Sequence, residues 1–326
     1  MTGQGRGPED AATGLVYDEA YLDHDTGGSH PETSDRLRAI MDRLRKEGLL
    51  KRLRRIEPRK AARKWITTIH TPDYVENVAE TCRAGNSCLH SLDTRICPAS
   101  FQVALLAVGG VLEAVDALQA GRVPNAFCAV RPPGHHATAD RAMGFCLFNN
   151  VAIAARYAQQ QHGLDRVLIV DWDTHHGNGT QDAFYDDPSV LYFSCHQSPF
   201  YPGTGAASET GRGEGEGYTI NVPLPAGTGN EEYLKAFRET LRPRALEFDP
   251  DLVLISAGFD AHRADTLGGM DVTEDGYARM TTEVMGIADE CCAGRIVSSL
   301  EGGYALAHQA RAVAAHLKAL MGDRAG

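Results

Sequence analysis

The stretch Val167-Leu-Ile-Val-Asp-Trp-Asp-Thr-His-His-Gly-Asn178 decides the expected fold. Its first four residues are apolar in succession, a pattern typical of a strand buried on both faces of a parallel sheet. Six further short runs follow this pattern: Gly14–Tyr17, Ala126–Val130, Val190–Ser194, Tyr218–Val222, Leu252–Ser256 and Ile296–Leu300. Segments with helical periodicity lie between many of them: Ser34–Gly48, Pro72–Ala84, Pro98–Ala120, Asn149–His162, Glu231–Leu246, Thr273–Cys292 and Leu306–Leu320. The order predicts an α/β protein: a single domain with a mostly parallel central β-sheet flanked by helices.

The chain has 326 residues and the composition of a soluble globular protein. Hydrophobic residues make up 43% and charged residues 23%, which excludes collagen, coiled coils, disordered chains and small disulfide scaffolds. The length alone would allow two domains. We expect one, because the polar residues of the expected site follow strands in both halves of the chain.

The net charge of −11 is unevenly distributed. The segment Arg36–Lys64 carries 13 basic and 3 acidic residues, so the remainder is strongly acidic. An acidic body argues against direct nucleic-acid binding and suits a cationic substrate. The basic segment has two interpretations: a solvated helix face with its connector, or a docking patch for an anionic partner or a second subunit.

The sequence also bears on compartment. Met1–Ala12 is polar and lacks the apolar core of a secretory signal. The apolar stretch Val103–Ala120 contains Glu113 and Asp116, so we expect an amphipathic helix and no membrane span. The eight cysteines form no C-x-x-C pair. We expect free, mostly buried thiols and a cytoplasmic protein.

Ionisable side chains follow four of the predicted strands. The segments concerned are Arg131-Pro-Pro-Gly-His-His136, Asp171-Trp-Asp-Thr-His-His-Gly-Asn178, Ala257-Gly-Phe-Asp260 and Glu301-Gly-Gly-Tyr304. Ligands of open α/β sheets bind beyond the carboxyl ends of the strands. One such end is commonplace, since an Asp or His there is usually a cap or a loop hydrogen bonder, but four converging ends predict a site.

Three of these side chains form a candidate metal site. Asp173 and His175 are two residues apart, so on extended chain they point to the same side. With Asp260 they supply mixed carboxylate and imidazole ligands, which is the pattern of a catalytic zinc site with an open water position. No cysteine is nearby, which argues against a closed structural site, and iron(II) or manganese stays open.

These motifs resemble those of the zinc-dependent histone deacetylase family, within the arginase/deacetylase fold. Tyr201-Pro-Gly-Thr-Gly205 and Ser256-Ala-Gly-Phe-Asp-Ala261 extend the match, and His30-Pro-Glu-Thr-Ser-Asp-Arg-Leu37 is similar to the opening loop of the class II branch. The resemblance covers about Gly14 to Leu320. It implies a class II-like, histone deacetylase-like amidohydrolase, with a flexible segment at residues 1–12 and a catalytic domain at residues 13–322.

The resemblance also implies the bound ions. Asp173, His175 and Asp260 match the ligands of one zinc ion per chain. Two further sets match structural potassium sites. The first set is Asp171, Asp173, His175, Ser194 and Cys195, and the second is Phe184, Asp187, Val190 and Tyr218.

Catalytic roles follow from the same resemblance. His136 matches the general base and acid that takes a proton from the metal-bound water and returns one to the leaving amine. His135 matches its electrostatic neighbour, oriented by Asp171. Tyr304 matches the donor to the substrate carbonyl and its oxyanion. Asn178 replaces an aspartate of many class I members and fits class II, so we expect a less raised pKa for His136.

The resemblance assigns a substrate tunnel. Phe145 and Tyr201 match the aromatic pair that lines it, and Gly144 matches a glycine of its wall. Leu267 occupies the mouth position where polyamine-selective relatives place a glutamate. Asp93 lies in a loop that we expect to anchor the substrate backbone.

The function implied is removal of acetyl or other short acyl groups from lysine side chains of a protein, peptide or small molecule. An acetylpolyamine or other small-molecule deacetylase is the first alternative. A catalytically inactive acyl-lysine binding protein is a second, although Tyr304 and both histidines are present. An arginase-like enzyme would need more bridging carboxylates. We expect no membrane or nucleic-acid partner, and the sequence leaves open a homo-oligomer.

Overall fold

The computed structural model of the protein describes residues 12–323. Eight strands form one sheet in the order β2-β1-β5-β10-β9-β6-β7-β8, and every pairing between them is parallel. The strands are β1 Gly14–Val16, β2 Arg54–Ile56, β5 Asn125–Cys128, β6 Val167–Asp171, β7 Val190–Gln197, β8 Thr219–Leu224, β9 Leu252–Ala257 and β10 Ile296–Leu300. The predicted single α/β domain with a parallel sheet is confirmed. The predicted flexible segment at residues 1–12 lies outside the described residues, apart from Ala12.

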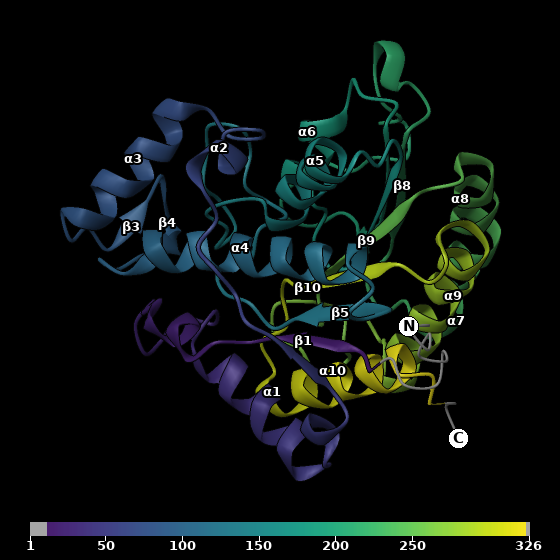
Figure 1. The fold of residues 1–326 in the computed structure, drawn as a ribbon, viewed down its shortest axis with the longest axis horizontal. Helices are drawn as coiled ribbons and strands as arrows, with labels where there is room; N and C mark the ends of the chain where they lie inside the picture. The colour runs from purple at the N-terminus through teal and green to yellow at the C-terminus, as the bar shows by residue number, and fades with distance from the viewer. Residues whose placement is uncertain (1–11, 324–326) are drawn as a thin grey trace, which may run out of the picture.

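Helices cover both faces of the sheet. Figure 1 shows α4, α5 and α6 on one side of the strands and α1 and α10 on the other. The helices are α1 Asp35–Lys46, α2 Arg63–Ile66, α3 Pro72–Arg83, α4 Ser100–Gln119, α5 Asn150–His162, α6 Asn178–Phe184, α7 Asn230–Lys235, α8 Arg242–Phe248, α9 Glu274–Cys292 and α10 Leu306–Leu320. The apolar runs predicted as strands are thereby enclosed, and β6, β9 and β10 are buried along their whole length.

Two strand features were not predicted. The edge strand β2 is Arg-Arg-Ile, and only Ile56 is buried. Charged residues are common on edge strands because they discourage pairing with another chain. A strand with such residues has no apolar run, so the apolar pattern used to predict strands does not detect it. A two-stranded antiparallel hairpin, β3 Cys88–Leu89 and β4 Ser91–Arg95, is separate from the main sheet and mostly polar.

The helix predicted over Glu231–Leu246 is divided. A π-helical segment, Ala236–Leu241, joins α7 to α8. Pro243 stands in the first turn of α8, where it lacks the amide N–H that an uninterrupted α-helix would use. The short helix α6 also escaped prediction, because its sequence lies inside a motif that we read as a strand end.

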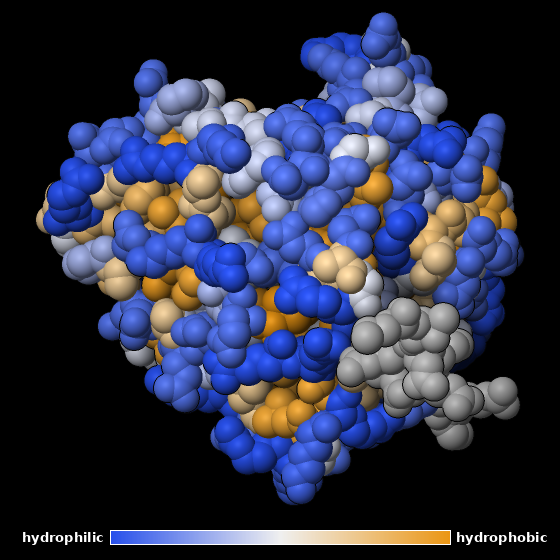
Figure 2. All heavy atoms as spheres, viewed as in Figure 1, coloured by the Kyte–Doolittle hydropathy of each residue, from blue (hydrophilic) through white to orange (hydrophobic). Residues whose placement is uncertain are grey.

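The helix α4 is the one helix of residues 12–323 that is long and apolar enough to cross a membrane. About 78% of that apolar window is buried inside the molecule. Such burial is that of a core helix. The face of the molecule in Figure 2 is mostly hydrophilic, with apolar patches that polar side chains separate from one another.

The basic segment differs from both interpretations at its first residue. Arg36 is fully buried, so for this residue the solvated-face and the docking-patch readings are both wrong. Seven other basic residues of the segment form ion pairs with acids of the same chain: Arg38, Arg43, Arg45, Arg52, Arg55, Arg59 and Arg63. Four of these seven pairs use acids outside the segment, namely Asp35, Asp323, Glu113 and Glu76, so part of its excess charge is matched on the folded surface.

Candidate active site

The four motif-bearing strands are neighbours in the sheet. β5, β10, β9 and β6 lie side by side, and their register sets Asp171 opposite Ser256 and Ala257 opposite Leu300. Their carboxyl ends therefore reach the same edge. The loops that follow deliver all four predicted motifs to that edge.

Asp173, His175 and Asp260 meet there as predicted from their positions. The Nδ1 atom of His175 lies 3.0 Å from Asp173 Oδ1 and 3.1 Å from Asp260 Oδ2. The second oxygen of each carboxylate is held by backbone: Gly302 N donates to Asp173 Oδ2 at 2.9 Å, and Thr174 N donates to Asp260 Oδ1 at 2.8 Å. These contacts fix the orientation of both carboxylates, as outer partners of metal ligands do.

The charge balance of this trio calls for a cation. Burial raises the pKa of Asp260, and the nearby Asp173 charge adds to that. Burial also opposes the charged form of His175, but hydrogen bonds to Asp173 and Asp260 outweigh it and raise its pKa to about 10. The imidazolium thus supplies the positive charge between two carboxylates. A divalent cation bound by the same one nitrogen and two oxygen donors would supply it equally, so these residues fit zinc.

Two glycines make room for side chains of the site. A Cβ at Gly302 would lie too close to the carboxylates of both Asp173 and Asp260. At Gly144, where φ is +54°, a Cβ would run into the ring of His136. Both positions therefore require the absence of a side chain.

The paired histidines have different partners. His135 Nδ1 lies 3.0 Å from Asp171 Oδ2, and His136 Nδ1 lies 2.8 Å from Asn178 Oδ1. Since the carbonyl oxygen of an amide can only accept, His136 must carry its proton on Nδ1 when neutral. Its Nε2 is then unprotonated. The two rings lie 4.0 Å apart between centroids.

The pKa values of His135 and His136 shift in opposite directions. Burial opposes charge on His135, but the Asp171 and Asp173 carboxylates outweigh it and raise its pKa to about 10. Burial, reinforced by the charges on His135 and His175, lowers the pKa of His136 well below its ordinary value. The hydrogen bond to Asn178 raises the pKa of His136 but does not outweigh burial, and the expected comparison with an aspartate at this position stays a prediction. One histidine is held as a cation and its neighbour as a neutral base.

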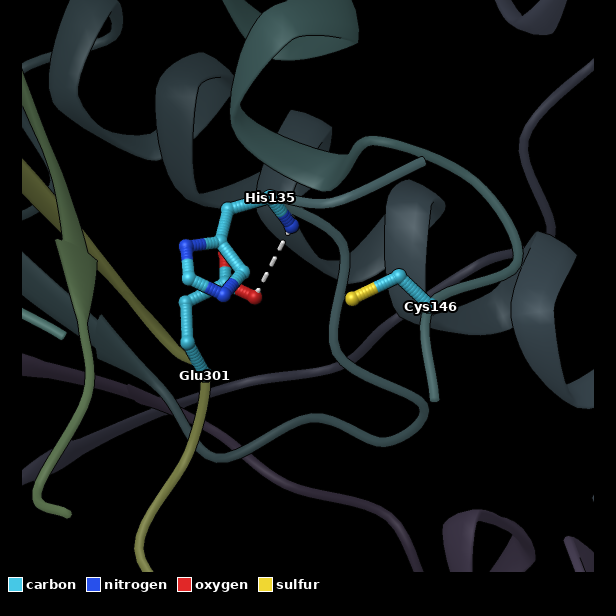
Figure 3. A group of neighbouring side chains, drawn as sticks. All are labelled: His135, Cys146 and Glu301. Carbon is cyan, nitrogen blue, oxygen red and sulfur yellow. Dashed lines mark hydrogen bonds between the residues drawn. The ribbon is translucent and has the colours of Figure 1, made fainter. Parts of the chain in front are cut away.

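Glu301 supports this pair from below. Its Oε2 accepts from Gly134 N at 2.6 Å and from His135 N at 3.2 Å, and Figure 3 shows it beneath His135 with the buried Cys146 thiol nearby. Burial raises the pKa of Glu301 to about 7. Ligand atoms of His135, Cys146 and Glu301 lie within 4.8 Å of one another. However, the carboxylate already accepts three hydrogen bonds, the third from Ser256 Oγ.

A cavity of about 250 Å³ reaches His175 of the trio. It is lined by every predicted substrate residue, together with His136, His175, Tyr304 and Phe200: the predicted ones are Asp93, Gly144, Phe145, Tyr201 and Leu267. Phe145 has φ of +70°, a left-handed conformation that costs a non-glycine residue free energy and is typical of functional loops. Its ring stands edge-on to that of Tyr304, with centroids 5.7 Å apart.

Sequence reasoning missed several contributors. Phe200 stacks on His175 at 5.2 Å and precedes Tyr201, so its aromatic neighbour was the available signal. Arg36 donates from Nε to Gly303 O at 2.6 Å and lies 5.0 Å from the Tyr304 ring centroid. Glu32, four residues earlier, accepts from both Arg36 and Arg131. Glu32 precedes α1, and nothing in the local sequence marks this ion pair as buried.

The predicted potassium sets occupy two places. In the first, Asp171 lies opposite Ser194 in the β6–β7 register, and Cys195 follows on the same buried strand. In the second, Asp187 Oδ2 is 2.6 Å from Arg156 Nη1, so its side chain already has a cationic partner. A cation at the second place would therefore depend on backbone carbonyls.

Known proteins resemble this chain over most of its length. A family profile described as "Histone deacetylase domain" matches residues 30–320. A protein of Archaeoglobus fulgidus named "Probable deacetylase" is 43% identical over 296 residues, which cover 90% of this chain and 82% of that protein. "Polyamine deacetylase HDAC10" of Homo sapiens is 44% identical over 328 residues, which cover 96% of this chain and 48% of the relative. The chain thus spans about half of that human protein.

A solved structure has the same architecture. The crystal structure of the HDA15 HD domain matches with a TM-score of 0.92 at 43% identity. The match covers 96% of this chain and 89% of that one. Fold and sequence therefore point to one family.

Proposed function

The chain belongs to the histone deacetylase family, and on that basis we propose that it is a zinc-dependent amidohydrolase that removes acetyl or other short acyl groups from lysine side chains. The observation that carries the proposal is the trio of Asp173, His175 and Asp260, whose ligand atoms lie within 4.8 Å of one another. These three residues would hold the zinc ion. Bound zinc polarises an amide carbonyl and lowers the pKa of a bound water toward about 7.

His136 acts as the proton carrier. Its Nδ1–H is committed to Asn178 Oδ1, and its lowered pKa keeps Nε2 unprotonated. Nε2 can therefore take a proton from the attacking water and pass it to the leaving amine. His135, held as a cation by Asp171, stabilises the negative charge that develops beside it.

Tyr304 supplies the hydrogen bond to the developing oxyanion. Burial raises the pKa of its hydroxyl well above the ordinary value, so the hydroxyl stays a donor. Arg36 fixes the preceding carbonyl and lies near the ring. A preorganised donor of this kind typically contributes about 10²- to 10³-fold to kcat.

The cavity favours acyl-lysine over acetylpolyamines. Its walls include Phe145, Phe200, Tyr201 and Leu267, which suit a flat neutral acyl group on an apolar stem. With Leu267 at the mouth, a free polyamine cation lacks the counter-charge of a glutamate there. The acetylpolyamine alternative keeps two supports: the Asp93 carboxylate at the cavity and the name of the human relative.

One substrate panel tests the proposal. The zinc-loaded enzyme should have a higher kcat/KM for an acetyl-lysine peptide than for acetylputrescine, and Tyr304→Phe should lower kcat by about 10²-fold or more. Leu267→Glu should shift the preference toward acetylputrescine by about tenfold or more, because one well-placed ion pair can contribute over 1 kcal/mol. Leu267→Gln, of similar size but uncharged, is the matched control.

Opposite results would redirect the assignment. A wild-type preference for acetylputrescine supports the small-molecule alternative. Binding of acetyl-lysine peptide without turnover by the zinc-loaded protein supports the inactive binding protein.

Structural potassium is part of the proposal at the first predicted set, which includes Ser194 and Cys195. The buried Asp171 beside β7 supplies negative charge there. The protein should unfold at a higher temperature in potassium chloride than in N-methylglucamine chloride of equal ionic strength. Equal unfolding temperatures would remove potassium from the proposal.

A further inference from the structure

Asp265 connects two loops of the candidate active site. Its Oδ2 accepts hydrogen bonds from Tyr304 N at 2.6 Å and from Ala305 N at 3.0 Å. Its Oδ1 accepts from Leu267 N at 3.0 Å. One carboxylate, only 8% exposed, therefore holds the backbone that carries the oxyanion donor and the backbone that carries the tunnel-mouth residue.

The Tyr304 segment depends on such outside contacts. Residues 301–305 form neither helix nor strand, and Gly303 has φ of +118°. The direction of the Tyr304 side chain is thus not fixed by regular hydrogen bonding within the segment. The Tyr304 amide donates to Asp265, and the Gly303 carbonyl accepts from Arg36. Both groups of the Gly303–Tyr304 peptide are therefore bound by side chains from elsewhere in the chain.

The position of Asp265 is itself fixed. Its amide donates to His262 O at 2.8 Å, and Ala264 N donates to His262 Nδ1 at 3.1 Å. His262 is buried. The carboxylate consequently projects from an ordered turn, as a positioning group must if it is to restrain a neighbouring loop.

We propose that Asp265 is a positioning residue for the hydrolysis: it sets the place of the Tyr304 hydroxyl by clamping the Tyr304–Ala305 amides to the Leu267 loop. The inference rests on the proposed deacetylase function. A carboxylate is required, because three N–H groups need two accepting oxygens and an asparagine offers one. A small displacement of a catalytic donor lowers the rate more than it lowers substrate binding.

Asp265→Asn is the principal test. In the zinc-loaded enzyme it should lower kcat on an acetyl-lysine peptide by about tenfold, with KM changed by less than about threefold, because Tyr304 acts in the transition state. Asp265→Ser, which keeps one acceptor in a smaller side chain, serves as a second variant should Asp265→Asn fail to fold. Zinc content and unfolding temperature are measured on each preparation.

Asp271→Asn is the matched control. This variant makes the same Asp-to-Asn change in the same loop. The Asp271 carboxylate pairs with Arg263 at the surface. Its kcat should stay within about twofold of the wild-type value, since exposed ion pairs contribute little.

A double-mutant cycle separates positioning from a general structural role. If Asp265 acts through Tyr304, then adding Asp265→Asn to Tyr304→Phe should lower kcat by less than about twofold. Two losses that multiply would overturn the inference, as would an Asp265→Asn enzyme with the kcat of Asp271→Asn. A wild-type protein that hydrolyses no acylated amine would instead overturn the proposed function, and this inference with it.

Discussion

Two histidine and carboxylate clusters in the described residues have similar donors and different surroundings. Asp173, His175 and Asp260 form one, and His262, Glu274 and His308 form the other; in each, the ligand atoms lie within 4.8 Å of one another. In the first, the ion-pair partners of the carboxylates within residues 12–323 are histidines. In the second, Arg311 donates to Glu274 Oε1 at 2.6 Å and to His308 Nδ1 at 2.5 Å.

The comparison shows that donor identity does not make a metal site. In the second cluster a guanidinium already neutralises the carboxylate and occupies a histidine lone pair. His262 Nδ1 accepts from Ala264 N, so the neutral ring carries its proton on Nε2, where a metal would bind. In the first cluster the carboxylates pair with histidines, and the proton on His175 is one that a metal can displace.

The largest expected effect comes from breaking the first cluster. The wild-type protein should retain one zinc ion per chain after dialysis. Asp260→Asn should abolish that retention and lower kcat at least about 10³-fold, more than the 10- to 100-fold typical of losing an outer partner of a ligand. Glu274→Gln in the second cluster should leave the zinc content at one per chain. Metal analysis with kinetics checks both, and equal zinc loss in the two variants would contradict the distinction.

The next effect is the pH dependence of metal removal. In the metal-free protein the pKa of His175 is raised to about 10, so its stabilising contribution is full below about pH 6.5 and is lost as pH rises toward 10. Zinc bound at His175 would replace that proton, so the stabilisation by zinc should grow with pH by about 1.4 kcal/mol per unit. Unfolding with and without zinc between pH 6.5 and 8.5 measures it. A difference that shrinks with pH would contradict the assignment.

The next prediction removes the Arg311 guanidinium from the second cluster. Arg311→Met should give the second cluster a weak zinc site that the wild-type protein lacks. The tautomer change at His262 costs roughly one hydrogen bond, about 1 kcal/mol, which is small beside the binding of zinc to two imidazoles and a carboxylate. Calorimetric titration of the zinc-loaded variant should show a second event, and Arg311→Lys, which retains the charge, should not.

The smallest effect concerns stability at the second cluster. Glu274→Gln breaks a pair in which Glu274 and Arg311 are each about one third exposed. Such pairs typically contribute less than about 1 kcal/mol to the free energy of unfolding. Chemical denaturation should detect a change of that size or none, with kcat within about twofold of wild type. A decrease of several kcal/mol in the free energy of unfolding would contradict this estimate and would mean that the cluster is important for stability.

Much of the fold and the candidate site could be predicted, for local reasons. The apolar runs around Val167–Val170 and Leu252–Ser256 are continuous because strands buried on both faces need apolar side chains throughout. The ligands Asp173 and Asp260 follow such strands closely. Because β6 and β9 are neighbours in the sheet, residues that follow them closely in the sequence also lie close together in space. The assigned roles of the catalytic and substrate residues stay predictions.

Other features had no local signal. Arg36 looks like any basic residue of its segment, yet it is buried against the Tyr304 loop, 267 positions away from the Gly303 carbonyl that it binds. Asp265 looks like a loop aspartate until Tyr304 is placed beside it. The edge strand β2 carries the charges that an edge tolerates.

The sequence by itself determined the alternation of strands and helices, the family, and the residues that could donate to a metal. Periodicity and motif chemistry are properties of residues that are neighbours in the chain. Only the tertiary structure decided which charges are free. A carboxylate, an imidazole or a guanidinium acts through the few ångströms around it, and those are filled by residues from distant strands and loops. The same histidine and carboxylate chemistry therefore forms a candidate zinc site beside Gly302 and an ordinary ion-pair cluster beside Arg311.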